Sequence, residues 1–349
     1  MSGEILLRSA ALLFTTLSGL FISRYAPISS LEDYYAFVPL STFVFSGFMS
    51  PLSSQFMGKL SSIPHFEQYI RFSWKNIVLI VAFVCAPMLI FIEEVSLVFF
   101  IFLLVDVIFG TYSGILLTSL SMNSERIVAA KLALVMAVLI STLPTFFFFL
   151  FDWNLKIYII SILITKFLFF IIVLFREEAS QSPRELVNID LRKYVQGVCA
   201  SLISWAGQHL PKLLILGASV GGSSAKIVTY IVAIQAGSYS LETIFRGYIE
   251  ESYTDGQIVS KRTIRNFLLA FLLLIPGSLF IIYLYTSDRE WQFSLPLYFT
   301  LIIFEMFRFI TSYISLKYQI ARLDFVVPIV LALVASVILI LANLFIFSL

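Results

Sequence analysis

Charged side chains lie inside long apolar stretches of this chain, and their types decide which chemistry is open to it. The basic ones are Arg8, Lys166, Lys212, Arg246 and Arg308, and the acidic ones are Asp106, Glu242 and Glu305. Because a lone charge in an apolar medium is costly, such side chains pair or line a hydrated site. The basic residues are in excess, and Arg suits phosphate oxygens through its bidentate geometry. The excess predicts a substrate cavity for an anionic cargo.

Some of these charges have partners within reach on their own helix. Glu242 and Arg246 are four residues apart, and Glu305 and Arg308 are three apart. Each pair is therefore spaced to neutralise itself on one helix face. If the carboxylates instead face the cavity, Glu242 and Glu305 are candidates for ion coupling.

Asp106 and Lys166 have no such neighbour, and each lies near the middle of an apolar stretch. Two interpretations are open for them. They form a salt bridge with each other across the first half of the chain, or they act separately, Lys166 on the cargo and Asp106 in ion coupling.

Uncharged polar side chains recur at helical spacing in a few of the same stretches. The candidates for lining the cavity are Ser46, Ser50, Ser204, Gln208, Gln235 and Tyr239. Residues three or four apart share a helix face. A stripe of serines also serves as a helix-packing face, which is the alternative for any one stripe. Stripes at equivalent places in the chain favour a shared hydrated cavity.

Motifs for other chemistry are missing from the sequence. It contains no G-x-x-x-x-G-K-[ST] phosphate loop, no H-E-x-x-H zinc motif and no G-x-S-x-G nucleophile elbow. With two His and two Cys, it offers few metal ligands. We therefore expect neither an enzyme nor a bound cofactor or metal.

The elements that position these residues are membrane-spanning helices. The chain has 349 residues, of which 60% are hydrophobic and 13% charged, and its mean hydropathy is +0.97. Soluble domains carry about 25% charged residues, so lipid must be the solvent for most of this surface. The net charge of +2 is too small to indicate nucleic-acid binding.

A spanning helix needs about 20 mostly apolar residues. Eleven segments qualify, at 5–22, 34–57, 76–92, 95–118, 127–151, 157–175, 194–217, 227–249, 264–285, 293–316 and 325–347. The loops on one side hold 12 Lys and Arg residues and those on the other side hold 4. By the positive-inside rule the N-terminus is cytoplasmic and the C-terminus outside. The first segment lacks a cleavage site and is not expected to be a removable signal peptide.

The spacing of the segments repeats. Measured from the first segment of each half, corresponding helix starts differ by less than ten residues. The halves are an N-terminal six-helix lobe at 1–175 and a C-terminal five-helix lobe at 194–349, joined by a cytoplasmic linker at 176–193. Two same-orientation repeats occur in several transporter folds. The polar stripes fall in the first two helices of each half, which predicts two lobes around a central cavity.

Two stretches resemble a known superfamily. They read LSGLFISRYAPISSLEDYYAFVPLSTFVFSGFMSPL and WAGQHLPKLLILGASVGGSSAKIVTYIVAIQAGS. Both are similar to the multidrug/oligosaccharidyl-lipid/polysaccharide (MOP) exporter superfamily, and specifically to the Wzx-type polysaccharide flippases. In the second stretch Lys212 occupies the family's basic position and Tyr230 its helix-opening Tyr, whereas Pro211 stands where an acidic residue is common.

The resemblance implies a flippase in the bacterial cytoplasmic membrane. Its cargo would be a polyprenyl-(pyro)phosphate-linked oligosaccharide for O-antigen, capsule or exopolysaccharide assembly, and a polysaccharide polymerase and a chain-length regulator would be its partners. Three alternatives stay open: a MATE-like small-molecule exporter, a membrane-embedded glycan polymerase or acyltransferase, and a non-transporting scaffold. The short predicted outer loops argue against the polymerase.

Overall fold

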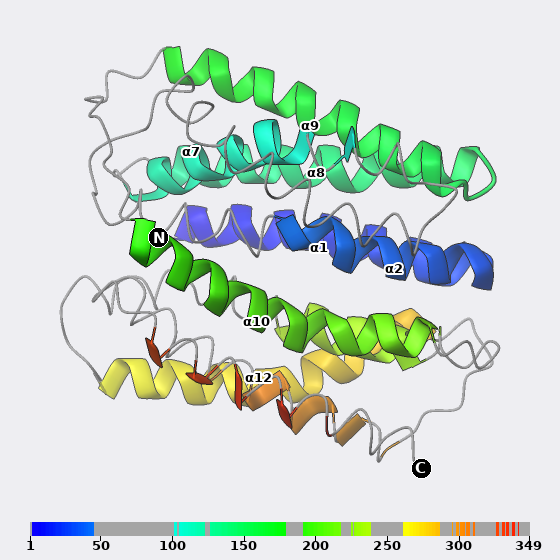
Figure 1. Ribbon diagram of the computed structural model, residues 1–349, viewed down its shortest axis with the longest axis vertical. Helices are drawn as coiled ribbons and strands as arrows, with labels where there is room; N and C mark the ends of the chain where they lie inside the picture. The colour runs from blue at the N-terminus through cyan, green and yellow to red at the C-terminus, as the bar shows by residue number, and fades with distance from the viewer. Residues whose placement is uncertain are drawn as a thin grey trace. The chain divides into compact units, whose positions relative to one another are not determined.

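The computed structural model describes residues 2–44, 101–102, 105–122, 126–178, 191–217, 225, 227–238 and 261–286, with scattered positions between 295 and 341. Nearly all of this part of the chain is helical, and it contains no β-strand (Figure 1). The predicted all-α class is confirmed for these residues. The count of eleven helices and the six-plus-five arrangement remain predictions.

The bounds of the helices follow the apolar segments closely. They are α1 (Ser2–Tyr25), α2 (Ile28–Val44), the π-helix η3 (Asp106–Gly110), α7 (Thr111–Met122), α8 (Arg126–Leu150), α9 (Leu155–Glu178), α10 (Leu191–Gly217) and α12 (Lys261–Thr286). Residues Ile227–Ser238 are also helical. The predicted segment 76–92 lies outside the described residues.

Among the described residues, four helices are long and apolar enough to cross a membrane. Their apolar stretches are Leu6–Tyr25, Ile127–Leu150, Leu155–Phe175 and Leu268–Tyr285. Each overlaps one of the predicted segments and meets the length that a spanning helix needs, about 20 residues. The chain is a multi-pass membrane protein.

Two segments differ locally from the prediction. Within 95–118 the helix is not uniformly α, because Asp106–Gly110 form a π-turn that leads into α7. The second helix begins at Ile28 and not at 34, because only Ala26 and Pro27 separate it from α1. The Leu31 amide donates to the Pro27 carbonyl at 2.9 Å, which starts the new helix directly after the proline.

By its contacts the chain divides into two compact units. The first comprises Met1–Ser18 and Leu40–Asp190, and the second comprises Gly19–Pro39 and Leu191–Leu349. Helix α1 is continuous across the boundary between Ser18 and Gly19. The predicted lobes and linker remain predictions.

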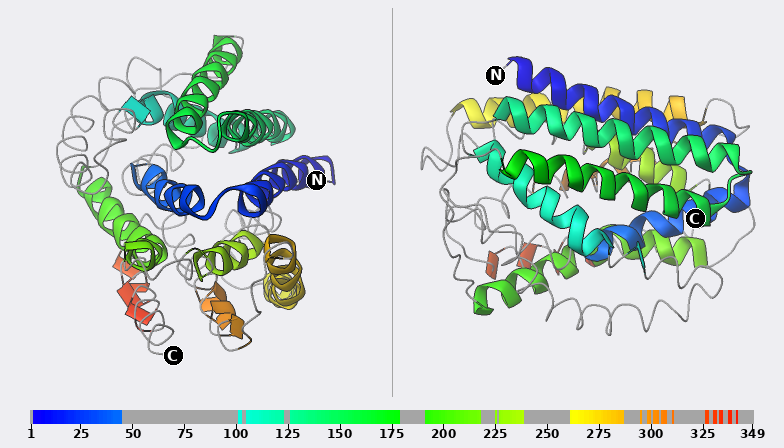
Figure 2. Two further views of the ribbon diagram at one scale, coloured as in Figure 1. Left: turned by 90° about the vertical axis from the view of Figure 1, so that its right-hand side faces the viewer. Right: turned by 90° about the horizontal axis from the view of Figure 1, so that it is seen from above.

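In the first unit, α7, α8 and α9 enclose an apolar core. Its buried members are Leu116, Leu120, Ala129, Phe169 and Val173. The first part of α1 joins this unit through hydroxyls, since Ser18 Oγ lies 2.9 Å from the Ser141 carbonyl and 2.5 Å from Thr145 Oγ1 on α8. Figure 2 shows α8 and α9 side by side from two directions.

In the second unit, buried hydroxyls join the helices. Tyr35 Oη of α2 lies 3.0 Å from Thr229 Oγ1, and both side chains are buried. Gly19 of α1 lies against Tyr285 of α12 so closely that an added Cβ would come within 2.6 Å of the phenol oxygen. A larger residue at position 19 would force the Tyr285 side chain to shift.

Candidate functional site

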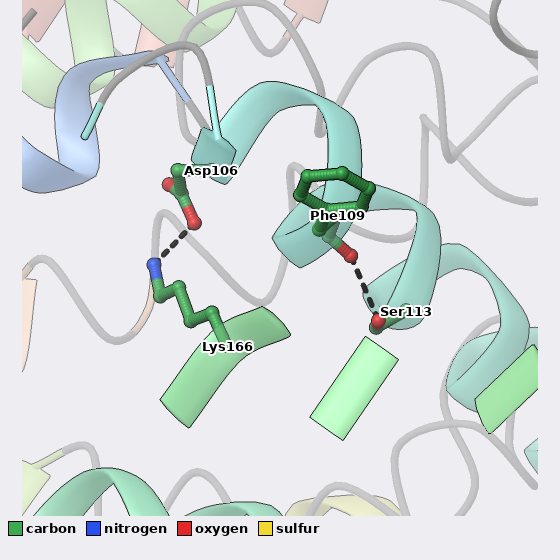
Figure 3. Close-up of polar contacts among 4 residues, drawn as sticks. All are labelled: Asp106, Phe109, Ser113 and Lys166. Carbon is green, nitrogen blue, oxygen red and sulfur yellow. Dashed lines mark hydrogen bonds and ion pairs between the residues drawn. The ribbon is translucent and has the colours of Figure 1, made fainter. Parts of the chain in front are cut away.

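Asp106 and Lys166 form a salt bridge inside the first unit. Asp106 opens η3 and is buried at 4% exposure, and Lys166 lies in the middle of α9 and is half-buried. Figure 3 shows the two side chains pointing toward each other. Of the two interpretations that the sequence left open, the ion pair is therefore confirmed. Pairing neutralises both charges in an interior where a lone charge is costly.

The π-turn holds the Asp106 carboxylate in place. A Cβ added to Gly110 would overlap one Asp106 carboxylate oxygen and would lie 3.6 Å from Lys166 Cδ. The carboxylate therefore occupies the space that a side chain at 110 would take. After the turn, Ser113 Oγ donates to the Phe109 carbonyl at 2.7 Å (Figure 3). π-turns are rare and occur often at functional sites.

Aromatic side chains lie near the ion pair or beside its residues in sequence. The Lys166 ammonium lies 4.9 Å from the centroid of the Phe102 ring, a cation–π distance. Phe109 packs against Phe167 and Phe170 of α9, with ring centroids 5.4 and 4.5 Å apart. Because Asp106 is buried and Lys166 half-buried, the attraction between the two charges is stronger than at a protein surface.

Arg8 has a carboxylate partner as well. Its guanidinium contacts the Glu4 carboxylate at 3.0 Å, one turn earlier on α1, and both side chains are half-buried. The sequence prediction treated Arg8 as a cavity cation and did not include Glu4. The signal was present, because an acidic residue four positions before a basic one is the favourable order on a helix.

Lys212 lies on α10 in the second unit and is 5% exposed. Its ammonium is 3.5 Å from His209 Nδ1. The His209 ring in turn lies 5.5 Å from the Trp205 ring, whose indole N–H donates to the Pro39 carbonyl at 3.1 Å. Trp205, His209 and Lys212 are spaced by four and three residues, so one face of α10 carries all three. The prediction included Lys212 alone.

Ser238, which the sequence prediction did not include, connects Glu305 to the backbone of the helix that carries Gln235. Ser238 Oγ lies 2.7 Å from Glu305 Oε2 and 3.1 Å from the Gln235 carbonyl oxygen, and all three residues are buried. A hydroxyl carries one proton, so Ser238 donates to one of these two oxygens at a time. The spacing of Gln235 and Ser238 on one helix face was the available signal.

The structure describes only some of the other predicted site residues. Ser204 and Gln208 lie within α10. Those outside the described residues are Ser46, Ser50, Tyr239, Glu242, Arg246 and Arg308. Among the described residues, no group of three or more His, Cys, Asp or Glu side chains could hold a metal. The cavity itself and the ion-coupling roles remain predictions.

Comparison with known proteins gives a likeness at the level of the fold. No family profile matches the sequence, and no curated protein matches it. A solved structure does match, described as the crystal structure of MATE in complex with Br-NRF. The match has a TM-score of 0.50 at 12% identity and covers 98% of this chain and 94% of the other. This chain therefore has a MATE-like fold over nearly its whole length.

Proposed function

We propose that this chain is an exporter of the MOP type in the bacterial cytoplasmic membrane, and not an enzyme. The observation that carries the proposal is the MATE-like fold over 98% of the chain. The four helices of membrane-spanning length support a multi-pass exporter. The distribution of Lys and Arg between the predicted loops supports a cytoplasmic N-terminus.

The proposed cargo is a polyprenyl-(pyro)phosphate-linked oligosaccharide repeat unit. The two sequence stretches that resemble Wzx-type flippases support this cargo. A buried ammonium at Lys212 on α10 supports it too, because a phosphate group offers the negative charge that such a residue favours. Trp205 adds an aromatic ring to the same helix face.

The basis for a cationic cavity is narrower than the sequence indicated. The Glu4 carboxylate neutralises Arg8, and the Asp106 carboxylate neutralises Lys166. The proposed phosphate-binding set comprises Lys212, which is buried on α10, and the sequence candidates Arg246 and Arg308.

Transport would proceed by alternating access. One half rocks against the other about a site near the middle of the membrane, as in other transporters built from repeats. The sugar–pyrophosphate head group crosses through the cavity, and the polyprenyl tail stays in lipid. Glu242 and Glu305 are the proposed sites of ion coupling, and Asp106 takes part through its ion pair with Lys166.

A MATE-like small-molecule exporter is the second candidate, and the same likeness favours it, because the solved MATE protein is described in complex with Br-NRF. The ion pair argues against a cationic cargo. The sequence offered Asp106 as the acidic residue for such a cargo, and Lys166 already neutralises it.

Deletion of the gene separates these candidates. A flippase defect traps complete lipid-linked repeat units on the cytoplasmic face, whereas a polymerase defect delivers single units outside. Unchanged glycans together with a changed resistance to small molecules would identify the second candidate. Complementation with Lys212→Ala should fail, and with Lys156→Ala, the matched change at an exposed lysine, it should succeed.

A further inference from the structure

The connection between α8 and α9 carries an unusual set of exposed rings. Two helical stretches of spanning length, Ile127–Leu150 and Leu155–Phe175, end at this turn (Figure 1). The last two turns of α8 and the residue after them expose large apolar side chains, at Phe146, Phe147, Phe149, Leu150 and Phe151. Their exposed fractions run from 37 to 56%. At about 100° per residue, the four of them that belong to α8 span an arc of about 160° around the helix.

Polar side chains follow these rings directly. Asp152, Asn154 and Lys156 are all exposed at the turn. Within about ten residues the surface therefore changes from aromatic to charged. Rings next to polar groups at the end of a span are typical of the boundary between lipid tails and headgroups.

The backbone of the turn is held in a costly conformation around a tryptophan. Asp152 and Trp153 have φ values of 52° and 60°, in the left-handed region that residues with a Cβ seldom adopt. The Trp153 amide donates to the Phe148 carbonyl at 2.7 Å. Its ring packs against Phe148 and Phe149, with centroids 5.2 and 5.6 Å apart. The buried Phe148 thereby fixes the indole at the tip of the turn.

We infer that the segment from Phe146 to Trp153 is a lipid-interface anchor that sets the depth of α8 and α9 in the membrane. Lipid contacts every open side of a helix, which matches exposed apolar side chains spread over an arc of about 160°. A second copy of the chain would cover a single side. An indole combines an apolar body with one N–H donor, and this combination suits the headgroup level. The inference rests on the membrane-spanning helices and holds for any cargo.

Tryptophan quenching by brominated phosphatidylcholine tests the inference. The full chain, with Trp74, Trp205 and Trp291 changed to Phe, reports on Trp153 alone in phosphatidylcholine vesicles. Lipid brominated at acyl carbons near the headgroup should quench Trp153 at least twofold more than lipid brominated deep in the tail. The matched control is the same variant with Trp153→Phe and Val135→Trp added. Its one tryptophan then lies at an exposed position inside the α8 span. It should show the opposite order.

Two outcomes would overturn the inference. If neither brominated lipid quenches Trp153, the indole lies in water or is covered by protein, for example by a second copy of the chain. Trp153 quenched more strongly by deep bromines lies in the bilayer core. If the triple variant does not fold, the quenching difference between the wild type and Trp153→Phe gives the same information with one conservative change. No step of this measurement depends on transport, so a failed export assay leaves it intact.

Discussion

The carboxylate of Asp106 and the ammonium of Lys166 are joined across 60 residues of sequence, and their salt bridge links η3 to α9. Neither residue has an opposite charge beside it along its own helix, and Gly110 leaves the space that the carboxylate occupies. The sequence offered this salt bridge as one of two interpretations, and the structure shows it directly.

Replacing either partner of this salt bridge alone should destabilise the protein strongly. Asp106→Ala or Lys166→Met alone leaves an uncompensated charge, and such changes cost about 3–5 kcal/mol in buried pairs. The double variant Asp106→Leu/Lys166→Met should recover most of the loss, because apolar replacement of a whole pair is often neutral. The check is the free energy of unfolding in detergent.

The Arg8–Glu4 pair is the matched control for that cycle, because it is a less buried pair within one helix. Arg8→Met or Glu4→Ala should cost less than about 1 kcal/mol. Equal losses at the two pairs would contradict the role given to burial at Asp106.

Gly110→Ala should destabilise the first unit. The new Cβ overlaps the Asp106 carboxylate, so the ion pair must shift or the π-turn must rearrange. Gly277→Ala in α12 is the control, because a Cβ there meets nothing within 4 Å. Since glycine weakens a helix interior, Gly277→Ala should stabilise by about 0.5–1 kcal/mol. Thermal unfolding of the two variants should shift in opposite directions, and a shift of the same sign would contradict the packing at Gly110.

A matched pair of changes tests the contact between Gly19 and Tyr285. Gly19→Ala should destabilise, because its Cβ would approach the phenol oxygen to 2.6 Å. Removing that oxygen with Tyr285→Phe leaves the nearest ring carbon at 3.6 Å, an ordinary contact distance. The double variant should therefore be more stable than Gly19→Ala alone, as measured by thermal unfolding. No rescue by Tyr285→Phe would show that the two residues do not meet.

The turn between α8 and α9 should be sensitive to changes at Asp152 and Asn154. Asp152→Val places a β-branched residue at a positive φ, which costs about 1–2 kcal/mol. Asn154 Oδ1 accepts the Lys156 amide at 2.9 Å and so caps α9, and Asn154→Ala should cost about 1 kcal/mol. Chemical denaturation measures both losses. Asp152→Gly removes the positive-φ penalty and serves as the control that should not destabilise.

Sequence reasoning succeeded where a property is local. The apolar stretches of α8 and α9 consist of consecutive residues, so hydropathy along the chain locates them. The bounds of both helices therefore lie close to the predicted segments 127–151 and 157–175. It did not find the π-turn at Asp106, because the apolar length of a segment does not distinguish i→i+5 from i→i+4 backbone hydrogen bonds. The early start of α2 after Pro27 also escaped it, because the apolar length of a segment does not mark where a polar first turn begins.

For the candidate site the sequence determined which charges lie in the apolar helices, because hydropathy and helical spacing depend on residue types alone. Only the tertiary structure decided which of them meet. Lys166 was open to the cargo or to Asp106, and the packing of η3 against α9 settled it. Ser238 reaches Glu305 across 67 residues, a distance along the chain that no helical spacing encodes. Partners between helices are set by how helix faces dock, and that depends on the whole chain at once.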